Sequence, residues 1–139
     1  MNRGMARVRN LPKGRSSVYL ARARQHERQL STALERRQWE AVGLSAVHLV
    51  ISSVDAVTCA KLGKVWSGED HGGVVDLLRE TGDPQVEGTL RQIATVLEAK
   101  TRVEYGAELA TASGASLMAK QARRIFDWAV ETLESADSR

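Results

Sequence analysis

The sequence predicts an all-α fold, an up-and-down bundle of four to five helices, from three observations. The longest apolar segment, residues 39–62, leaves so little polar helix surface that other helices must surround it. Apolar residues recur at steps of three and four in further segments on both sides of it. Two prolines and six aromatic residues in 139 argue against a chain of many short strands.

The N-terminal residues predict a basic tail followed by the first helix. Residues 1–16 carry five cations, two glycines and a proline but no acid, so they cannot bury enough apolar surface to order themselves. We predict a flexible tail over 1–16 and a helical bundle over 17–135. The first helix begins after Ser16 or Ser17, either of which can cap it, and runs to about Arg37.

The central segment, 39–62, has apolar stripes and one polar edge. Ser45, His48, Ser52, Asp55 and Cys59 recur at steps of three and four, so they share an edge of the helix. A serine-histidine-aspartate triad is excluded, because a single straight helix holds these groups about a turn or more apart. We expect the edge to hydrogen-bond neighbouring helices.

Asp55 is the charged member of that edge. A carboxylate on so apolar a helix needs a cation or several donors, and we expect Lys100 or Arg102 to supply it. The edge would then position the segment 100–105.

Three more helices follow. A stretch with four glycines, 63–73, predicts a loop, and it lacks the spacing and the Lys-Ser or Lys-Thr of a nucleotide P-loop. A short helix then ends near residues 82–84, a longer one covers about 84–105, and a last one begins near Ala115 after a turn. The end of the chain, 135–139, should fray.

Charge is divided unevenly along the chain. Residues 1–37 hold ten Lys or Arg against two Glu, a balance of +8, whereas residues 38–139 hold ten basic and fifteen acidic residues, a balance of −5. This asymmetry predicts that the basic arm meets a polyanion, or that it docks on the acidic body of another copy.

Cysteine and histidine usage predicts neither a metal nor a cofactor. Cys59 is the single cysteine and fits a reducing, cytoplasmic compartment. No two of the three histidines stand three or four residues apart on one helix. The N-terminus has no apolar stretch of the kind a secretory signal needs, and the uncharged run 41–54 is shorter than the roughly 20 residues that span a bilayer. We therefore expect no membrane segment.

Basic residues near a tyrosine indicate nucleic-acid contacts, since cations bind phosphates and an aromatic ring stacks on a base. In the alternative, Arg102 pairs with Glu98 and Tyr105 covers the core. The candidate contacts are Arg3, Arg7, Arg9, Lys13, Arg15, Arg22, Lys100, Arg102 and Tyr105.

The combined pattern over residues 20–135 resembles the HEPN superfamily. It is similar to small stand-alone bacterial members, found often in actinobacteria, that carry a Lys-x-x-x-Glu-Tyr-like signature. The matching stretches are Ser53-Val54-Asp55-Ala56-Val57, Asp70-His71 before Val75-Asp76-Leu77-Leu78, Leu97-Glu98-Ala99-Lys100-Thr101-Arg102-Val103-Glu104-Tyr105 and Ala122-Arg123-Arg124-Ile125-Phe126-Asp127-Trp128-Ala129. The positions that the resemblance marks are Asp55, Asp70, His71, Lys100, Glu104 and Tyr105.

The resemblance implies a homodimer and, in many members, a metal-independent ribonuclease with an Arg placed before a His by four to six residues. This sequence has no such pair: of the positions that would hold the Arg, only Lys64 is basic. Loss of a positioned general acid or base typically removes about 10² to 10⁴ in rate. We therefore predict non-catalytic binding of RNA or DNA.

Two alternatives stay open. The first is a protein-interaction module of a toxin–antitoxin-like or stress-response pair. The second is a ribonuclease with an altered site of Lys100, Arg102, Glu104 and His71.

Overall fold

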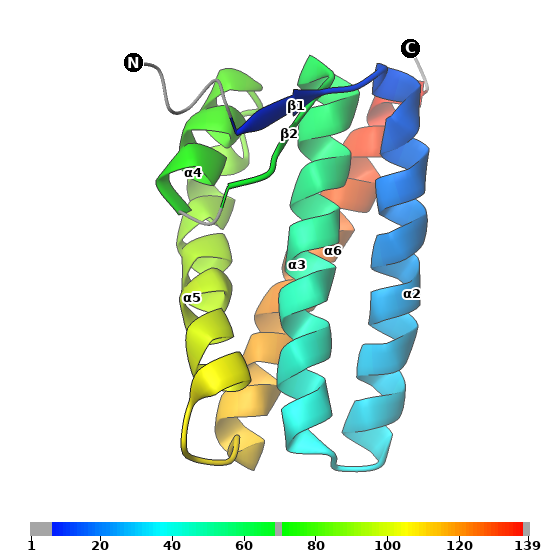
Figure 1. The fold of residues 1–139 in the computed structure, drawn as a ribbon. Helices are drawn as coiled ribbons and strands as arrows, with labels where there is room; N and C mark the ends of the chain where they lie inside the picture. The colour runs from blue at the N-terminus through cyan, green and yellow to red at the C-terminus, as the bar shows by residue number, and fades with distance from the viewer. Residues whose placement is uncertain (1–6, 69–70, 138–139) are drawn as a thin grey trace.

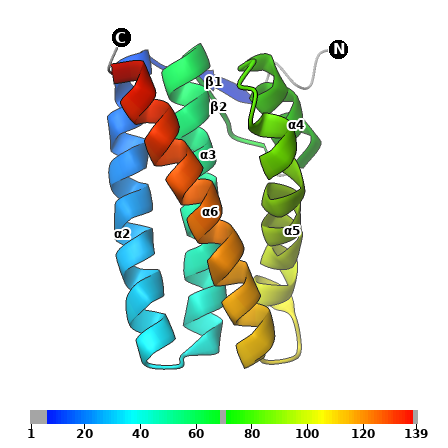
Figure 2. The same cartoon turned by 180° about the vertical axis from the view of Figure 1, so that it is seen from behind.

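The computed structural model describes residues 7–68 and 71–137, and within them the chain forms an all-α bundle with a small two-stranded sheet at one end. Figure 1 shows α2, α3 and α5 side by side, and Figure 2, the view from behind, shows α6 crossing in front of α3. The predicted fold class is therefore confirmed. The helices are α2 (Ser16–Glu35), α3 (Trp39–Leu62), α4 (His71–Glu80), α5 (Val86–Tyr105) and α6 (Ala112–Asp137), with a short 3-10 turn η1 (Lys13–Arg15) before them.

Helix α3 is the centre of the bundle and has the bounds that the sequence predicts. It contacts α2, α4, α5 and α6, and its buried residues lie all round it except along one outer edge. Its length and mean hydropathy of 1.6 would suffice for a membrane span, but 78% of that apolar window is buried inside the fold. This burial is typical of the core helix of a soluble protein.

A tight turn joins α2 to α3 and sets which of their residues face each other. The Gln38 N–H donates to the Ala33 carbonyl and the Arg37 N–H to the Leu34 carbonyl, the two hydrogen bonds of a Schellman motif. Arg37 occupies the left-handed position of this motif, with φ of 54°. The two helices therefore run antiparallel as a helical hairpin.

Residues 7–15 are ordered, so the predicted flexible tail is wrong for this part; residues 1–6 lie outside the described residues. Strand β1 (Val8–Asn10) pairs antiparallel with β2 (Lys64–Trp66), with Arg9 opposite Val65. The Leu11 N–H donates to the Gly63 carbonyl at 2.8 Å, and Leu11 packs against the core. Backbone pairing with a distant segment thus orders a stretch that has little apolar surface of its own.

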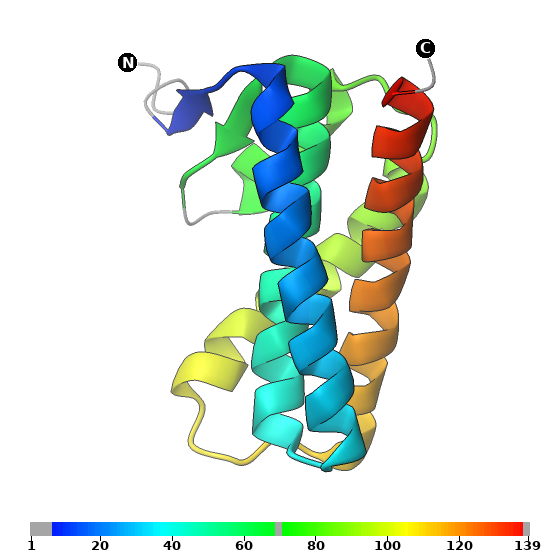
Figure 3. The ribbon, with the colours of Figure 1, turned by 90° about the vertical axis from the view of Figure 1, so that its right-hand side faces the viewer.

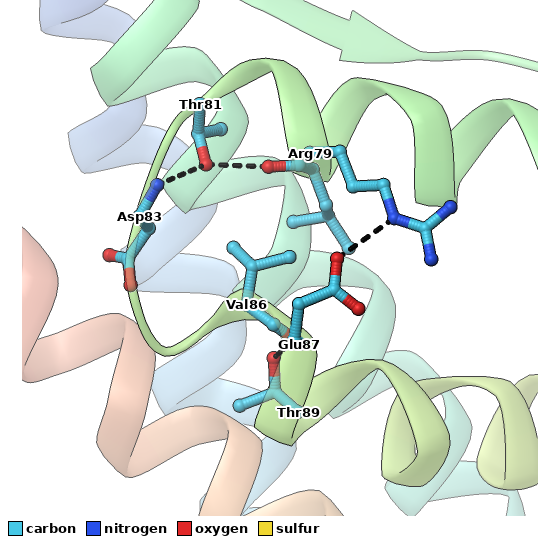
Figure 4. A network of polar contacts seen from close by, with 7 residues as sticks. Arg79, Thr81, Asp83, Val86, Glu87 and Thr89 are labelled. Carbon is cyan, nitrogen blue, oxygen red and sulfur yellow. Dashed lines mark hydrogen bonds and ion pairs between the residues drawn. The ribbon is translucent and has the colours of Figure 1, made fainter.

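The connection between α4 and α5 is held by polar contacts near Asp83 (Figure 4). The Thr81 hydroxyl donates to the Leu78 carbonyl and accepts from the Asp83 N–H, and the Asp83 carboxylate accepts from the Gln85 N–H at 2.8 Å. Arg79 pairs with Glu87 across the turn at 3.0 Å. Helix α5 therefore begins at Val86, two residues after the predicted start.

Helix α6 begins at Ala112, three residues before the predicted Ala115. The Thr111 hydroxyl accepts a hydrogen bond from the Gly114 N–H at 3.0 Å, which caps the first turn. Figure 3 shows the end of α5 and the turn into α6 at the end of the bundle opposite β1 and β2.

Candidate nucleic-acid interface

Five of the predicted phosphate-binding residues lie at one end of the molecule. Arg9 belongs to β1 and Arg7 directly precedes it, Lys13 and Arg15 belong to η1, and Arg22 to the second turn of α2, and all five are exposed. Figure 1 shows β1 and the start of α2 at the same end of the bundle. We call these five residues the basic face. Arg3 lies outside the described residues.

The segment 7–15 that carries most of the basic face is fixed to the end of α3. The Ser67 hydroxyl and N–H both donate to the Arg7 carbonyl, which holds one end of β1. The Cys59 thiol, fully buried, donates to the Pro12 carbonyl at 3.6 Å. Gly63 adopts a left-handed φ of 65°, and a Cβ there would lie 2.8 Å from the Leu11 carbonyl oxygen. The cations are therefore presented from an ordered scaffold.

Arg22 is oriented by an aromatic ring. Its guanidinium lies over the Tyr19 ring, 5.4 Å from the ring centroid, and Tyr19 itself is buried with 9% exposure. A planar guanidinium stacked on a ring keeps its N–H donors free to bind anions at its edge. This contact holds Arg22 on the outer side of α2.

Asp55 lies next to the basic face, on the outer edge of α3. Burial raises the pKa of its carboxyl to about 7, and the nearby charges of Arg22 and Arg9 oppose that shift. Burial, with a smaller contribution from Asp55, also raises the pKa of the Cys59 thiol. The cations near Asp55 are thus Arg22 and Arg9.

The expected partnership of Asp55 with Lys100 or Arg102 is therefore wrong. Helix α5 runs from the end that carries β1 to the opposite end, so its last turns lie at the end of the bundle where α3 begins. A Cβ on Gly43, in the second turn of α3, would lie 3.2 Å from the Val103 side chain. Asp55 is several turns further along the helix.

The polar edge of α3 packs along α2 rather than toward the segment 100–105. His48 stacks on His26 of α2, with ring centroids 5.2 Å apart and an interplanar angle of 24°. Ser45 and Ser52 are buried, and Ser45 lines a shallow groove with Arg28 and Gln29 of α2. The edge therefore does not position the segment 100–105.

His26 was not among the predicted functional residues, although the sequence contains a signal for it. His26 and His48 are equally far along the chain from Arg37, the turn residue of the hairpin. In an antiparallel helix pair, residues equally distant from the turn face each other. Arg9 approaches Asp55 only through the pairing of β1 with β2, for which the local sequence carries no such signal.

Lys100, Arg102 and Tyr105 form a separate group at the other end of the bundle. Tyr105 is 80% exposed, so it does not cover the core, and among the described residues Arg102 forms no ion pair with Glu98. Arg102 instead lines a cavity of about 310 Å³ with Glu40, Met118 and Gln121. Lys100, Arg102 and Tyr105 therefore do not form one surface with the basic face.

Parts of the altered ribonuclease site lie outside the described residues. These parts are the side chains of His71 and Glu104, so that site stays a prediction; the motif position Asp70 lies outside the described residues as well. Within the described part of the chain, no cluster of three or more His, Cys, Asp or Glu side chains suits a metal ion. Comparisons with protein-family models, with curated proteins and with solved structures find no match for the chain.

Proposed function

We propose that the protein binds nucleic acid, RNA or DNA, through the basic face, without catalysing a reaction on it. One observation carries this proposal: Arg7, Arg9, Lys13, Arg15 and Arg22 lie in or directly before three elements and are exposed together at one end of an ordered bundle. Between Arg7 and His26 the chain contains no acidic residue. A concentration of positive charge of this kind attracts a polyanion.

The basic face also retains unsatisfied charge. Among the described residues, Arg9, Lys13, Arg15 and Arg22 form no ion pair, whereas Lys64, Arg79 and Arg123 pair with glutamates elsewhere on the surface. Each unpaired cation that neutralises a phosphate releases a condensed counterion. Binding should therefore weaken steeply as salt rises.

The test measures how fluorescein-labelled single-stranded RNA and DNA oligonucleotides bind, by fluorescence anisotropy between 50 and 200 mM salt. The variant Arg9→Gln/Lys13→Gln/Arg15→Gln removes three charges and keeps residues 7–15 in place. Each lost phosphate contact on a single strand lowers the salt slope by about 0.7, so the slope should fall by about 2 and the low-salt affinity by tenfold or more. Deleting residues 1–16 is a poorer test, because it also exposes Cys59 and the end of α3.

A matched control removes three exposed cations from α5 and α6: Arg91→Gln/Lys120→Gln/Arg124→Gln. This variant should keep the wild-type salt slope. The proposal is wrong if both triple variants bind like wild type, or if wild-type protein binds neither RNA nor DNA at 50 mM salt.

We further propose that the chain is a cytoplasmic member of the HEPN superfamily and a homodimer. The helical order of the bundle and the motif positions in α3 and α5 support this proposal. Incubation of mixed RNA substrates with the wild type and with Lys100→Ala and Arg102→Ala variants tests the ribonuclease alternative. Cleavage that both variants reduce would favour an altered catalytic site over simple binding.

The second candidate function is protein interaction through the end of the bundle near the α5–α6 turn. Tyr105, Leu109 and Leu117 are exposed there by 80%, 81% and 54%, beside the cavity that Arg102 lines. Exposed apolar residues gathered at one place are typical of protein contact sites. Sedimentation equilibrium should show self-association that Leu109→Ser/Leu117→Ser weakens, while Val18→Ser at the opposite end does not.

A further inference from the structure

A cavity of about 310 Å³ lies between the last turns of α5, the α5–α6 turn and the first turns of α6, at the end of the bundle opposite β1 and β2 (Figure 3). Small-molecule sites are concave, mostly apolar pockets of about 300–1,000 Å³ in which a few polar groups orient the ligand. The cavity has the size of such a site. The apolar part of its lining includes Ala99, Val103, Leu109, Ala115, Leu117 and Met118.

Contacts between elements hold the wall of this cavity in place. The Glu40 carboxylate of α3 accepts a hydrogen bond from the Ala110 N–H, which ties the α5–α6 turn to the start of α3. The Thr111 hydroxyl accepts from the Gly114 N–H at 3.0 Å and so joins the same turn to the first turn of α6. All four residues line the cavity. Its shape is therefore set by fixed backbone as well as by side chains.

Charges of both signs line the cavity without neutralising each other. Arg102 contributes a guanidinium from α5, and Glu108 and Glu40 contribute carboxylates. Among the described residues none of these three forms an ion pair, so the guanidinium lies farther from both carboxylates than an ion pair allows. An unpaired cation and an unpaired anion beside one apolar cavity suit a ligand that carries both charges.

Gln121 adds an unused hydrogen-bond acceptor to the same lining. Its Oε1 is buried and accepts no hydrogen bond from the described residues. Buried polar atoms without a partner are few in folded proteins, and a molecule from outside the chain is one way to satisfy them. Because the terminal torsion of a glutamine is broad, the amide can turn its oxygen toward a donor that enters the cavity. An ammonium group has such donors.

We propose that this cavity binds an apolar α-amino acid. The ligand carboxylate pairs with Arg102, its ammonium group donates to Glu108 and to the Gln121 Oε1, and its side chain fills the apolar part of the cavity. An anionic ligand without the ammonium group would leave the glutamates unpaired, and a cationic ligand without the carboxylate would leave the arginine unpaired. The site is separate from the basic face, so it does not depend on the proposed binding of nucleic acid.

The test titrates ¹⁵N-labelled protein with L-leucine and follows the amide chemical shifts by NMR. We expect saturable shifts around the cavity, at Val103 and Ala115 among others, with a Kd of about 10 mM or lower for so small a ligand. Two probes resolve the charges: 4-methylpentanoate is leucine without its ammonium group, and 3-methylbutylamine is leucine without its carboxylate. Each should bind at least about tenfold more weakly than leucine, because each loses one charge-assisted contact.

Two variants assign these contacts to residues. Arg102→Gln should bind leucine no more tightly than it binds 3-methylbutylamine, since the carboxylate has lost its partner. Glu108→Gln should bind leucine no more tightly than it binds 4-methylpentanoate, since the ammonium group has lost its partner. The matched controls Arg91→Gln and Glu98→Gln remove exposed charges of α5 outside the cavity lining and should bind leucine as wild type does.

Three results would overturn the proposal. The first is the absence of saturable shifts with leucine at concentrations several times the expected Kd. The second is an analogue that binds wild type as tightly as leucine does, which would make the site specific for one charge only. The third is leucine binding of wild-type strength in Arg102→Gln or in Glu108→Gln. None of these results bears on oligonucleotide binding by the basic face.

Discussion

His26 of α2 and His48 of α3 stack face to face across the helical hairpin, with ring centroids 5.2 Å apart and an interplanar angle of 24°. We expect this contact to couple the two positions energetically at pH 8. In a double-mutant cycle with His26→Ala, His48→Ala and the double variant, the coupling energy should be about 0.5–1.5 kcal/mol, the range of aromatic pairs. Urea unfolding monitored by circular dichroism measures it.

Gln29 supplies the control for this cycle, because its Oε1 accepts a hydrogen bond from His26 Nδ1 at 3.3 Å and its side chain does not stack on His48. Gln29→Ala combined with His48→Ala should give additive losses. If the losses in the free energy of unfolding were additive for His26→Ala and His48→Ala as well, the stacking of the two rings would add nothing to the stability that each ring contributes by its own packing.

Asp55 should make the folded state less stable as pH rises through the neutral range. Its pKa is about 7 in the folded protein against an ordinary value of 3.8, so between these values the folded state holds a proton that the unfolded state has released. Stability therefore falls with rising pH over this window and is constant above it. Asp55→Asn removes the titration, and at pH 8 it should be more stable than wild type by several kcal/mol, at most about 4.

The same variant should differ little from wild type near pH 4, because this pH lies close to the ordinary pKa of 3.8 and the unfolded state has only begun to release its proton. Chemical denaturation of Asp55→Asn and wild type at intervals from pH 4 to pH 8.5 measures the difference. The control, Asp127→Asn, should follow wild type throughout. A stability difference that does not change with pH would contradict the burial of the Asp55 carboxyl.

The helices of this fold are predictable because their signals are local. Residues 39–62 carry an apolar pattern that is unambiguous over its whole length, and the structure begins and ends the helix at these residues. The starts of α5 and α6 differ from the predicted ones, because Asp83 and Thr111 fix them by capping contacts that the apolar pattern does not contain. The apolar pattern of the sequence thus predicts that a helix exists, and capping by side chains decides at which residue it starts.

The candidate site was predicted only in part, for a related reason. The cations of residues 7–22 are visible in the sequence, but the order of residues 7–15 depends on pairing with Lys64–Trp66, far along the chain. The partners of Asp55 depend on the same pairing, so the sequence favoured the wrong cations, Lys100 and Arg102. Contacts inside the hairpin are easier to predict from the sequence, because the turn at Arg37 fixes which residues of α2 and α3 face each other.

Arg37 occupies a backbone position that glycine prefers, so Arg37→Gly should stabilise the protein. The left-handed conformation costs a non-glycine residue about 1–2 kcal/mol, and part of this gain is offset by the larger entropy of glycine in the unfolded chain, roughly 0.5–1 kcal/mol. We expect a net gain of up to about 1 kcal/mol in the free energy of unfolding. Its neighbour Arg36 has a right-handed φ of −87°, so Arg36→Gly should destabilise the protein instead.

Gly63 should hold the segment 7–15 against the end of α3, and Cys59 offers a way to measure this. An alanine at position 63 would adopt a left-handed φ and place its Cβ 2.8 Å from the Leu11 carbonyl oxygen. The conformation alone costs about 1–2 kcal/mol, and the close contact acts on the backbone that joins β1 to α3. We therefore expect Gly63→Ala to favour local opening of residues 7–15.

That opening should expose the Cys59 thiol, which is fully buried and donates to the Pro12 carbonyl. Labelling of the native protein by a thiol reagent should be about tenfold faster in Gly63→Ala for each 1.4 kcal/mol lost from the docked state. Gly88→Ala is the matched control, since a Cβ at that position of α5 meets no atom of the described residues within 4 Å. Equal labelling rates in Gly63→Ala and wild type would mean that residues 7–15 do not cover the thiol, and the scaffold of the basic face would then lose its main support.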